Sequence, residues 1–164
     1  MRIQSSRVIA AQMEALGAVP RVMTLAETRE ALETGWVEGT ENTPSNMLSQ
    51  NIYEVQPYAT LSYHGYLGYA VIVNTAFWNA LPRDVQEELI RALEEATDFA
   101  NGIAADKNAE ALSLVAEAGK TELHELTASE REAWVTALRP VYADMRDWLG
   151  ESLVDVALST LNLP

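Results

Sequence analysis

The sequence predicts an α/β fold with a short, mostly parallel sheet, flanking helices and one long helix, for three reasons. The first 60 residues repeat a short extended segment, a hydroxyl residue and a helical pattern three times, an alternation typical of parallel sheets. Residues 69–73 form an uninterrupted apolar run, typical of a strand buried on both faces. Apolar residues then recur every three or four positions from Val85 to Ile103, which predicts the long helix.

Residues that start and end helices set the bounds of the three repeated units. Hydroxyl oxygens accept hydrogen bonds from the free N–H groups of a first helical turn, and glycine ends a helix easily. The extended segments are predicted at residues 2–4, 18–23 and 37–41. The helix starts are predicted at Ser5–Ser6, at the capping box Thr24–Glu27 and at Thr43–Pro44, and the first two helices end at Gly17 and Gly35.

After the apolar run the chain changes to long helical patterns. We expect a short helix over 75–81, the long helix from about 83 to 117, a strand over 121–126 and an amphipathic segment over 151–161. A second capping box, Thr127–Glu130, opens a helix with Trp134 and Trp148 on its apolar face. Because proline removes a helical hydrogen bond, Pro140 is expected to kink or split that helix.

Residues 55–82 contain no charged side chain, which raises the question of a membrane span. Glycine and polar residues interrupt the stretch, and its longest purely apolar run is residues 69–73. A spanning helix needs about 20 apolar residues, so we predict none.

The first residues show no charged n-region, apolar h-region or cleavage site. The sequence therefore predicts no signal peptide in this chain; either the protein is cytoplasmic or its beginning is missing.

The composition excludes several kinds of partner. The 24 acidic and 11 basic residues give a formal charge of −13, and residues 83–164 carry 17 of those acids against seven cations. Such a charge repels nucleic acid and anionic membranes at long range. The absence of cysteine excludes disulfides and thiolate metal sites.

Catalytic motifs are absent from the sequence, which predicts no enzyme, no catalytic residue, no cofactor and no metal. The chain has two histidines and no thiol, and it lacks a Gly-x-Ser-x-Gly elbow, a Walker loop and a His-Glu-x-x-His pattern. We expect structural roles for His64 and His124. The remaining alternative is a small α/β enzyme that uses His64 with Glu41 or Glu54 as acid and base.

The three predicted strand-to-helix junctions of the first 60 residues indicate a binding site for an anion. In open α/β sheets, ligands lie beyond the carboxyl ends of the strands, where helix N-termini present free N–H groups. Arg2 lies on the strand before the first such junction and Asn42 at the third. Arginine can donate two parallel hydrogen bonds to a carboxylate, and asparagine adds a neutral donor. The alternatives are a surface arginine and an asparagine that only caps a helix.

Several motifs in fixed order resemble one family. They are Gly39-Thr40-Glu41-Asn42-Thr43-Pro44-Ser45-Asn46, Tyr53-Glu54-Val55-Gln56, His64-Gly65-Tyr66-Leu67-Gly68-Tyr69, Met23-Thr24-Leu25-Ala26-Glu27 and the passage Asn74 to Pro82. Together they are similar to the solute-binding proteins of tripartite ATP-independent periplasmic (TRAP) transporters, of the C4-dicarboxylate type. Members are roughly twice as long, so the chain resembles their C-terminal half.

The resemblance implies part of a two-lobed periplasmic-binding-protein-like fold that closes on a carboxylate-bearing solute. It implies a periplasmic location and delivery of the solute to membrane permease subunits. Residues 1–67 would belong to the second lobe, 68–107 would return to the first lobe, and 108–164 would pack on the second. Substrate-binding roles are implied for Arg2, Asn42, Leu25, His64 and Tyr66.

One alternative of another class stays open, an acidic helical interaction module in which residues 83–164 dock on a protein partner. The resemblance also implies that surfaces around Tyr69–Val73 and Val85–Ile103 lack their packing partners. We therefore expect the isolated chain to self-associate. The identity of the organic acid stays open.

Overall fold

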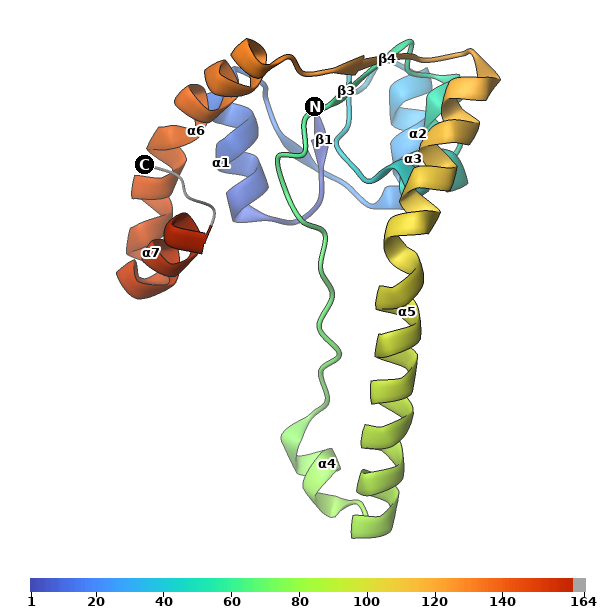
Figure 1. Cartoon of the computed structure of the whole chain (residues 1–164), viewed down its shortest axis with the longest axis vertical. Coiled ribbons are helices and arrows are strands. Elements are labelled where there is room, and N and C mark those ends of the chain that lie inside the picture. Colours follow the sequence, from blue (N-terminus) through green and yellow to red (C-terminus); the bar gives the residue numbers. More distant parts are fainter. Residues whose placement is uncertain (161–164) are drawn as a thin grey trace.

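The computed structural model of the chain describes residues 1–160, which form a body and a long arm that projects from it (Figure 1). We call residues 1–67 and 108–160 the body and residues 68–107 the arm. The elements in chain order are β1 (Arg2–Ile3), α1 (Arg7–Ala15), β2 (Arg21–Val22), α2 (Leu25–Glu33), α3 (Pro44–Ser49), the 3-10 helix η1 (Ile52–Glu54), β3 (Tyr58–Leu61), α4 (Thr75–Ala80), α5 (Arg83–Ala118), β4 (Glu122–Glu125), α6 (Ala128–Leu149) and α7 (Glu151–Thr160).

The predicted helix starts and ends are confirmed. The Ser6 hydroxyl accepts from the Ile9 N–H at 3.2 Å. The Thr127 N–H donates to Glu130 Oε2 at 2.8 Å, as a capping box requires. Gly17, Gly35 and Gly119 follow their helices at φ of 82°, 71° and 64°, a backbone conformation that glycine adopts without strain.

The strands pair in parallel, as predicted, in two separate two-stranded sheets. β1 pairs with β2, and Arg2 lies opposite Arg21. β3 pairs with β4, and the connection between them runs out through α4 and back along α5 (Figure 1). The extended segment predicted at 37–41 contributes only an isolated parallel bridge between Thr40 and Arg2. The class is therefore α/β with short parallel pairing.

The prediction of a buried strand at residues 69–73 is wrong. The segment has no regular secondary structure, and Tyr69 and Ile72 are 86% and 89% exposed. The strand that forms in this charge-free stretch is β3, which the sequence analysis missed. β3 finds β4 as a hydrogen-bonding neighbour, whereas residues 69–73 pair with no strand among residues 1–160. An isolated strand cannot satisfy its own backbone groups.

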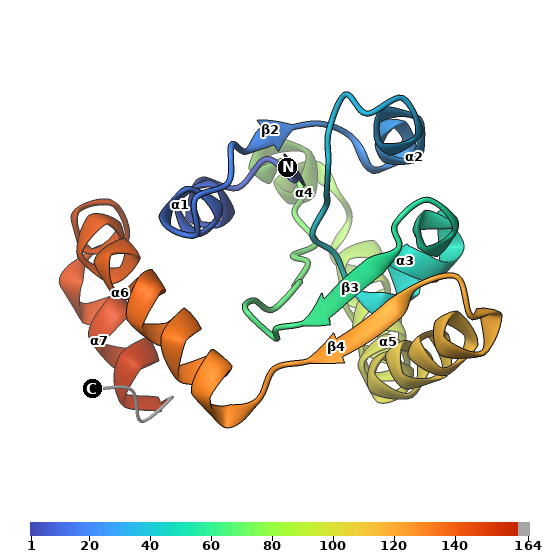
Figure 2. The same ribbon diagram turned by 90° about the horizontal axis from the view of Figure 1, so that it is seen from above.

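Helix α6 does not split at Pro140; it is one continuous helix of 22 residues. Its ribbon changes direction along its length (Figure 1). Its buried face, Leu138, Val141 and Met145, packs against Val8 and Leu16 of the α1 region. Figure 2 shows α1 alongside α6. This packing holds the first helix of the chain against the last third. The predicted last segment agrees with α7, and Leu161 lies outside the described residues.

A second small core lies under α2. Ala31, Leu32, Val37 and Ile52 are buried together, and Met23 and Met47 pack against them. The inner end of α5 joins this part of the body, because Ala111 and Val115 are buried and Asn108 Oδ1 accepts from the Ser45 N–H at 3.2 Å.

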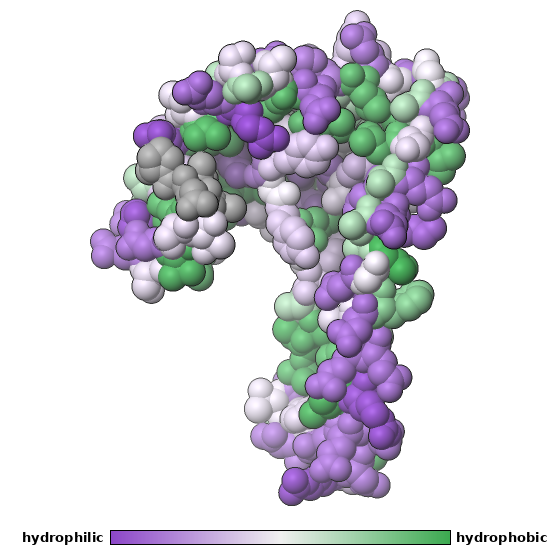
Figure 3. Space-filling view, viewed as in Figure 1, coloured by the Kyte–Doolittle hydropathy of each residue, from purple (hydrophilic) through white to green (hydrophobic). Residues whose placement is uncertain are grey.

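The arm has almost no buried side chain. All residues from 87 to 107 are exposed. The space-filling view shows hydrophobic side chains along one edge of the arm and hydrophilic ones along the other edge and at the tip (Figure 3). Among the exposed apolar residues are Ile72, Phe77, Leu89, Ile90 and Phe99.

Among the described residues, no helix is both long and apolar enough to cross a membrane.

Candidate functional site

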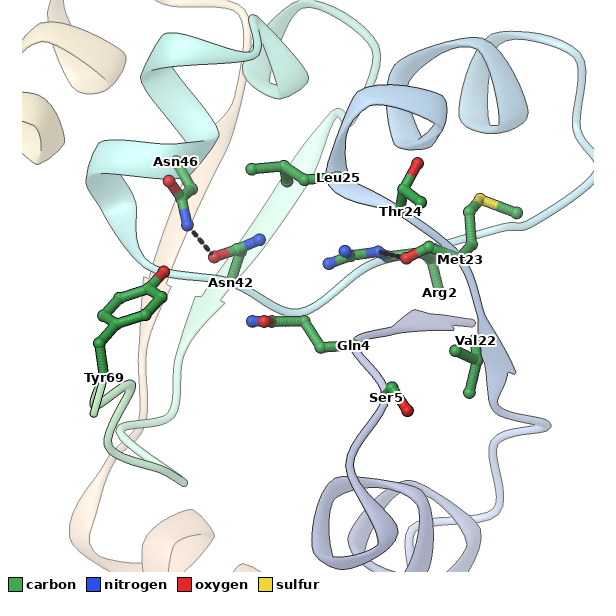
Figure 4. A pocket seen from close by; sticks show the side chains of 10 residues that line it. All are labelled: Arg2, Gln4, Ser5, Val22, Met23, Thr24, Leu25, Asn42, Asn46 and Tyr69. Atoms are coloured by element: carbon green, nitrogen blue, oxygen red, sulfur yellow. Dashed lines mark hydrogen bonds between the residues drawn. The ribbon is translucent and has the colours of Figure 1, made fainter. Parts of the chain in front are cut away.

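A cavity of about 340 Å³ lies where the starts of α1, α2 and α3 meet, beyond the end of β1 (Figure 4). Its lining consists of Arg2, Gln4, Ser5, Val22, Met23, Thr24, Leu25, Asn42, Asn46 and Tyr69. The repeated strand-then-helix units of the first 60 residues thus bring the starts of α1, α2 and α3 to one place. The lining holds one cationic side chain and no carboxylate, although the chain carries 24 acidic residues.

Arg2 is held rigidly at the floor of this cavity. It is only 2% exposed. Its backbone N–H donates to the Gly39 carbonyl at 2.7 Å, and its Nε donates to the Met23 carbonyl at 3.1 Å. The Nη1 atom is buried without a hydrogen-bond partner. Burial lowers the pKa of Arg2 from its ordinary value, and the negative charge of Glu41 raises it in part. The guanidinium stays cationic at neutral pH.

Asn42 presents a donor on the opposite side. Its Oδ1 accepts from the Thr43 N–H at 2.9 Å and from Asn46 Nδ2 at 2.6 Å. Because both bonds use the oxygen, the network assigns the Nδ2 amide as the free group. Figure 4 shows the Arg2 guanidinium and the Asn42 side chain pointing toward one another across the cavity. An acceptor placed between them could take hydrogen bonds from both.

Leu25 is the third predicted residue that the structure brings to this cavity, where it adds an apolar wall. The sequence patterns did not indicate the lining residues Gln4, Thr24, Asn46 and Tyr69. Asn46 lies in the first turn of α3, four positions after Asn42, and this spacing could have indicated it. Tyr69 could not have been found, because the apolar run at residues 69–73 predicts a buried strand there. Its hydroxyl points toward Asn42 and Asn46 (Figure 4).

His64 and Tyr66 do not line the cavity. Tyr66 is 94% exposed. His64 lies in the loop after β3, partly buried, where Ser62 Oγ lies 2.8 Å from its Nδ1 and Glu41 Oε2 lies 3.8 Å from its Nε2. Its ring is 6.2 Å from that of Trp134.

Ser62, His64 and Glu41 are the residue types of a hydrolytic triad, but they lie outside the cavity. None of the three lines the cavity, so a molecule held there would not contact this group. Glu54, the other acid considered with His64, pairs instead with Arg29 and Lys120, whose hydrogen bonds lower its pKa. The described lining of the cavity thus offers a cationic side chain, Arg2, and no histidine or acidic side chain.

A metal site is not formed in the part of the chain that the structure describes: residues 1–160 contain no group of three or more histidine or acidic side chains that could hold an ion. The second histidine, His124, lies on β4 with its Nε2 3.2 Å from Glu130 Oε1.

Comparison with known proteins points to one family. The model of "bacterial extracellular solute-binding protein, family 7" matches residues 1–147. The chain is 55% identical over 161 residues to the C4-dicarboxylate-binding periplasmic protein DctP of Rhodobacter capsulatus, and the match covers 98% of this chain and 48% of that protein. A protein of the same name from Shewanella loihica is 38% identical over 97% of this chain and 47% of its own length.

Solved structures agree with these relatives. A TRAP periplasmic solute-binding protein from Shewanella oneidensis with bound succinate superposes with a TM-score of 0.93 at 37% identity, over 96% of this chain and 52% of that one. Another TRAP periplasmic solute-binding protein, from Pseudomonas aeruginosa PAO1 with bound L-malate, superposes with a TM-score of 0.83 at 40% identity. The match covers 87% of this chain and 50% of that one. The chain thus spans about half the length of the curated relatives it matches.

Proposed function

This chain belongs to family 7 of the bacterial extracellular solute-binding proteins, and from that premise we propose its function. It forms part of the solute-binding subunit of a TRAP transporter outside the cytoplasm. It binds a carboxylate-bearing solute such as a C4-dicarboxylate and delivers that solute to the membrane permease. Relatives named as C4-dicarboxylate-binding proteins, and similar structures that hold succinate and L-malate, support this proposal.

The observation that carries the proposal is the make-up of the cavity. In a chain of charge −13, its lining contains Arg2 and no acidic residue. A carboxylate between Arg2 and the Asn42 amide would meet a charged donor and a neutral one, and both are fixed by other bonds. Leu25 would contact the carbon chain of the solute. We propose that His64 and Tyr66 border the cleft without touching the solute.

We also propose a division of the chain between two lobes. Residues 1–67 and those from 108 onward form one lobe, and residues 68–107 return to the other. The exposed apolar side chains of the arm support this division, because an exposed apolar patch of this kind is typical of an interface.

The interaction-module alternative is not favoured. The family match runs over residues 1–147, so it joins the first half and the acidic helices in one solute-binding protein. Docking of residues 83–164 alone would leave the cavity without a role.

Arg2→Lys should weaken succinate binding by about 1.5–3 kcal/mol, because lysine cannot make the two-pronged bond to a carboxylate. Calorimetric titration would use this chain joined to the half of the Rhodobacter capsulatus relative that the match leaves uncovered. Arg21→Lys is the matched control, since Arg21 pairs with Arg2 in the sheet but is exposed. Succinamide, the uncharged analogue, should not bind. Equal affinity in the Arg2→Lys and control variants would remove Arg2 from the site.

Asn42→Asp separates the two roles of Asn42. Aspartate keeps the oxygen that accepts from Thr43 and Asn46 but replaces the free donor by a second, negatively charged acceptor. Succinate affinity should fall at least tenfold, or about 1.4 kcal/mol, while the melting temperature changes by no more than a few degrees. If the melting temperature collapses and the affinity holds, Asn42 is only a helix cap.

A further inference from the structure

Glu41 is a buried acid that the proposed solute contacts do not use. The parallel bridge between Arg2 and Thr40, together with the Arg2 N–H bond to the Gly39 carbonyl, fixes the segment that carries Glu41 beside β1. The Glu41 side chain is 8% exposed. Its Oε1 is buried without a hydrogen-bond partner, as is Nη1 of Arg2. These are the two unpartnered buried side-chain atoms among the residues that the structure describes.

Each of these two groups would be costly to bury alone. A buried charge loses its hydration, and it is retained where an opposite charge compensates it. Glu41 attracts the Arg2 guanidinium, but the two form no direct ion pair within 4.0 Å. The compensation therefore acts through space, and it leaves Nη1 of Arg2 without a hydrogen-bond partner.

The second carboxylate oxygen of Glu41, Oε2, lies near His64. This oxygen lies 3.8 Å from His64 Nε2, and Ser62 fixes the opposite ring nitrogen of His64. Gln12 Nε2 of α1 donates to the His64 carbonyl at 3.3 Å. These contacts hold the Glu41 carboxylate near His64, and the lining of the cavity does not include Glu41.

We propose that Glu41 is the resident counter-ion of Arg2 in the empty site, and that a solute carboxylate takes over this role when it binds. The second half of this statement rests on the proposed function. Glu41 then stabilises the empty protein at the expense of solute affinity. Without it, Arg2 would hold an anion more tightly and the empty fold would be weaker. Such an exchange suits a protein that must release its solute.

The first experiment tests the coupling of the two charges and needs no solute. Melting temperatures of the 164-residue chain would be compared for Glu41→Gln, Arg2→Met and the double variant, with Glu38→Gln as a control that removes an exposed charge from the same segment. Glu41→Gln should lower the melting temperature by about 5–10 °C. In the Arg2→Met background the same change should have less than about a third of that effect.

The remaining outcomes overturn the coupling. Equal effects of Glu41→Gln with and without Arg2 would mean that the two charges are independent. If Glu41→Gln fails to fold, Glu41→Asp must still fold and melt near the wild type, because the proposal depends on the charge and not on the shape. Failure of both variants would assign Glu41 a packing role instead.

The second experiment tests the exchange by titrating succinate into the joined protein, with sodium chloride at equal ionic strength as control. Glu41→Gln should bind succinate about tenfold more tightly than the wild type, and succinate should raise its melting temperature more. Equal or weaker binding would overturn the exchange while leaving the proposed function intact. If neither protein binds succinate, the exchange and the proposed function both fail, and the melting data alone decide the coupling.

Discussion

Ile3 of the body is completely buried, whereas Ile72 of the arm is 89% exposed. The same contrast holds along α5: Val115, near its inner end, is 0% exposed, and Phe99, in the arm, is 69% exposed. One helix thus passes from a packed environment into an unpacked one without losing its helical backbone, since α5 is continuous from Arg83 to Ala118.

Ion pairs also differ between the body and the arm, in how far apart in the chain the paired residues lie. In the body, Glu54 joins Arg29 of α2 to Lys120 before β4, at 2.8 and 2.7 Å, so one carboxylate links segments far apart in the chain. In the arm and where it meets the body, the ion pairs are local to α5 and link residues three or four apart: Arg83–Glu87, Glu88–Arg91 and Lys107–Glu110. Such pairs support a helix but bring no second element to it.

The comparison teaches which structures need a partner. A helix satisfies its backbone within itself, so the arm half of α5 forms while its apolar residues stay exposed. A strand needs a neighbour, and residues 69–73 have none among residues 1–160. The arm therefore has local structure without a core, and the body has both.

The largest predicted effect is on the association state of the chain, and it should come from the exposed arm. We expect the isolated chain to self-associate despite its charge of −13, because the arm exposes contiguous apolar side chains. The double variant Val71→Ser and Ile72→Ser should shift the population toward monomer. Light scattering at several concentrations would measure this, with Trp36→Ser as a control at an exposed aromatic of the body. A compact wild-type monomer would contradict the view that the arm lacks its partner.

Matched isoleucines give the next largest effect. Ile3→Ala should lower the free energy of unfolding by about 2–5 kcal/mol, because it leaves a cavity under β1. Ile72→Ala should change it by less than about 0.5 kcal/mol, because little apolar area is lost from the packed interior. Urea unfolding of both variants in dilute solution would measure the difference. Comparable losses would show that the arm is packed after all.

The smallest effect concerns the long-range ion pairs of the body. Hydrogen bonds from Lys120 and Arg29 lower the pKa of Glu54 below its ordinary value of 4.5. A carboxyl whose pKa is lowered by folding stabilises the protein above its unfolded pKa and loses this contribution as the pH falls through the folded value. Glu54→Gln should therefore flatten the decline of the urea midpoint below about pH 4.5. Glu38→Gln is the exposed control; the same flattening there would show that the effect is not specific to Glu54.

Most helices were predictable because their signals are local. The capping box at Thr127, the prolines after Thr43 and Leu81, and the glycines that end α1, α2 and α5 act within a few residues of themselves. Of the two outcomes predicted at Pro140, the split does not occur: α6 continues through the proline, and its buried face packs on α1. Tertiary contacts there outweigh a local preference.

The sequence by itself determined the helix bounds, the parallel α/β class, and the positions of Arg2 and Asn42 near helix starts. Only the tertiary structure decided that β3, rather than residues 69–73, becomes the strand, because strand formation depends on a distant neighbour. It also decided that Tyr69 and Asn46 join the cavity and that Glu41 lies buried beside Arg2. Burial and electrostatic compensation depend on what the folded chain brings together across many residues, and no local pattern of amino acids encodes them.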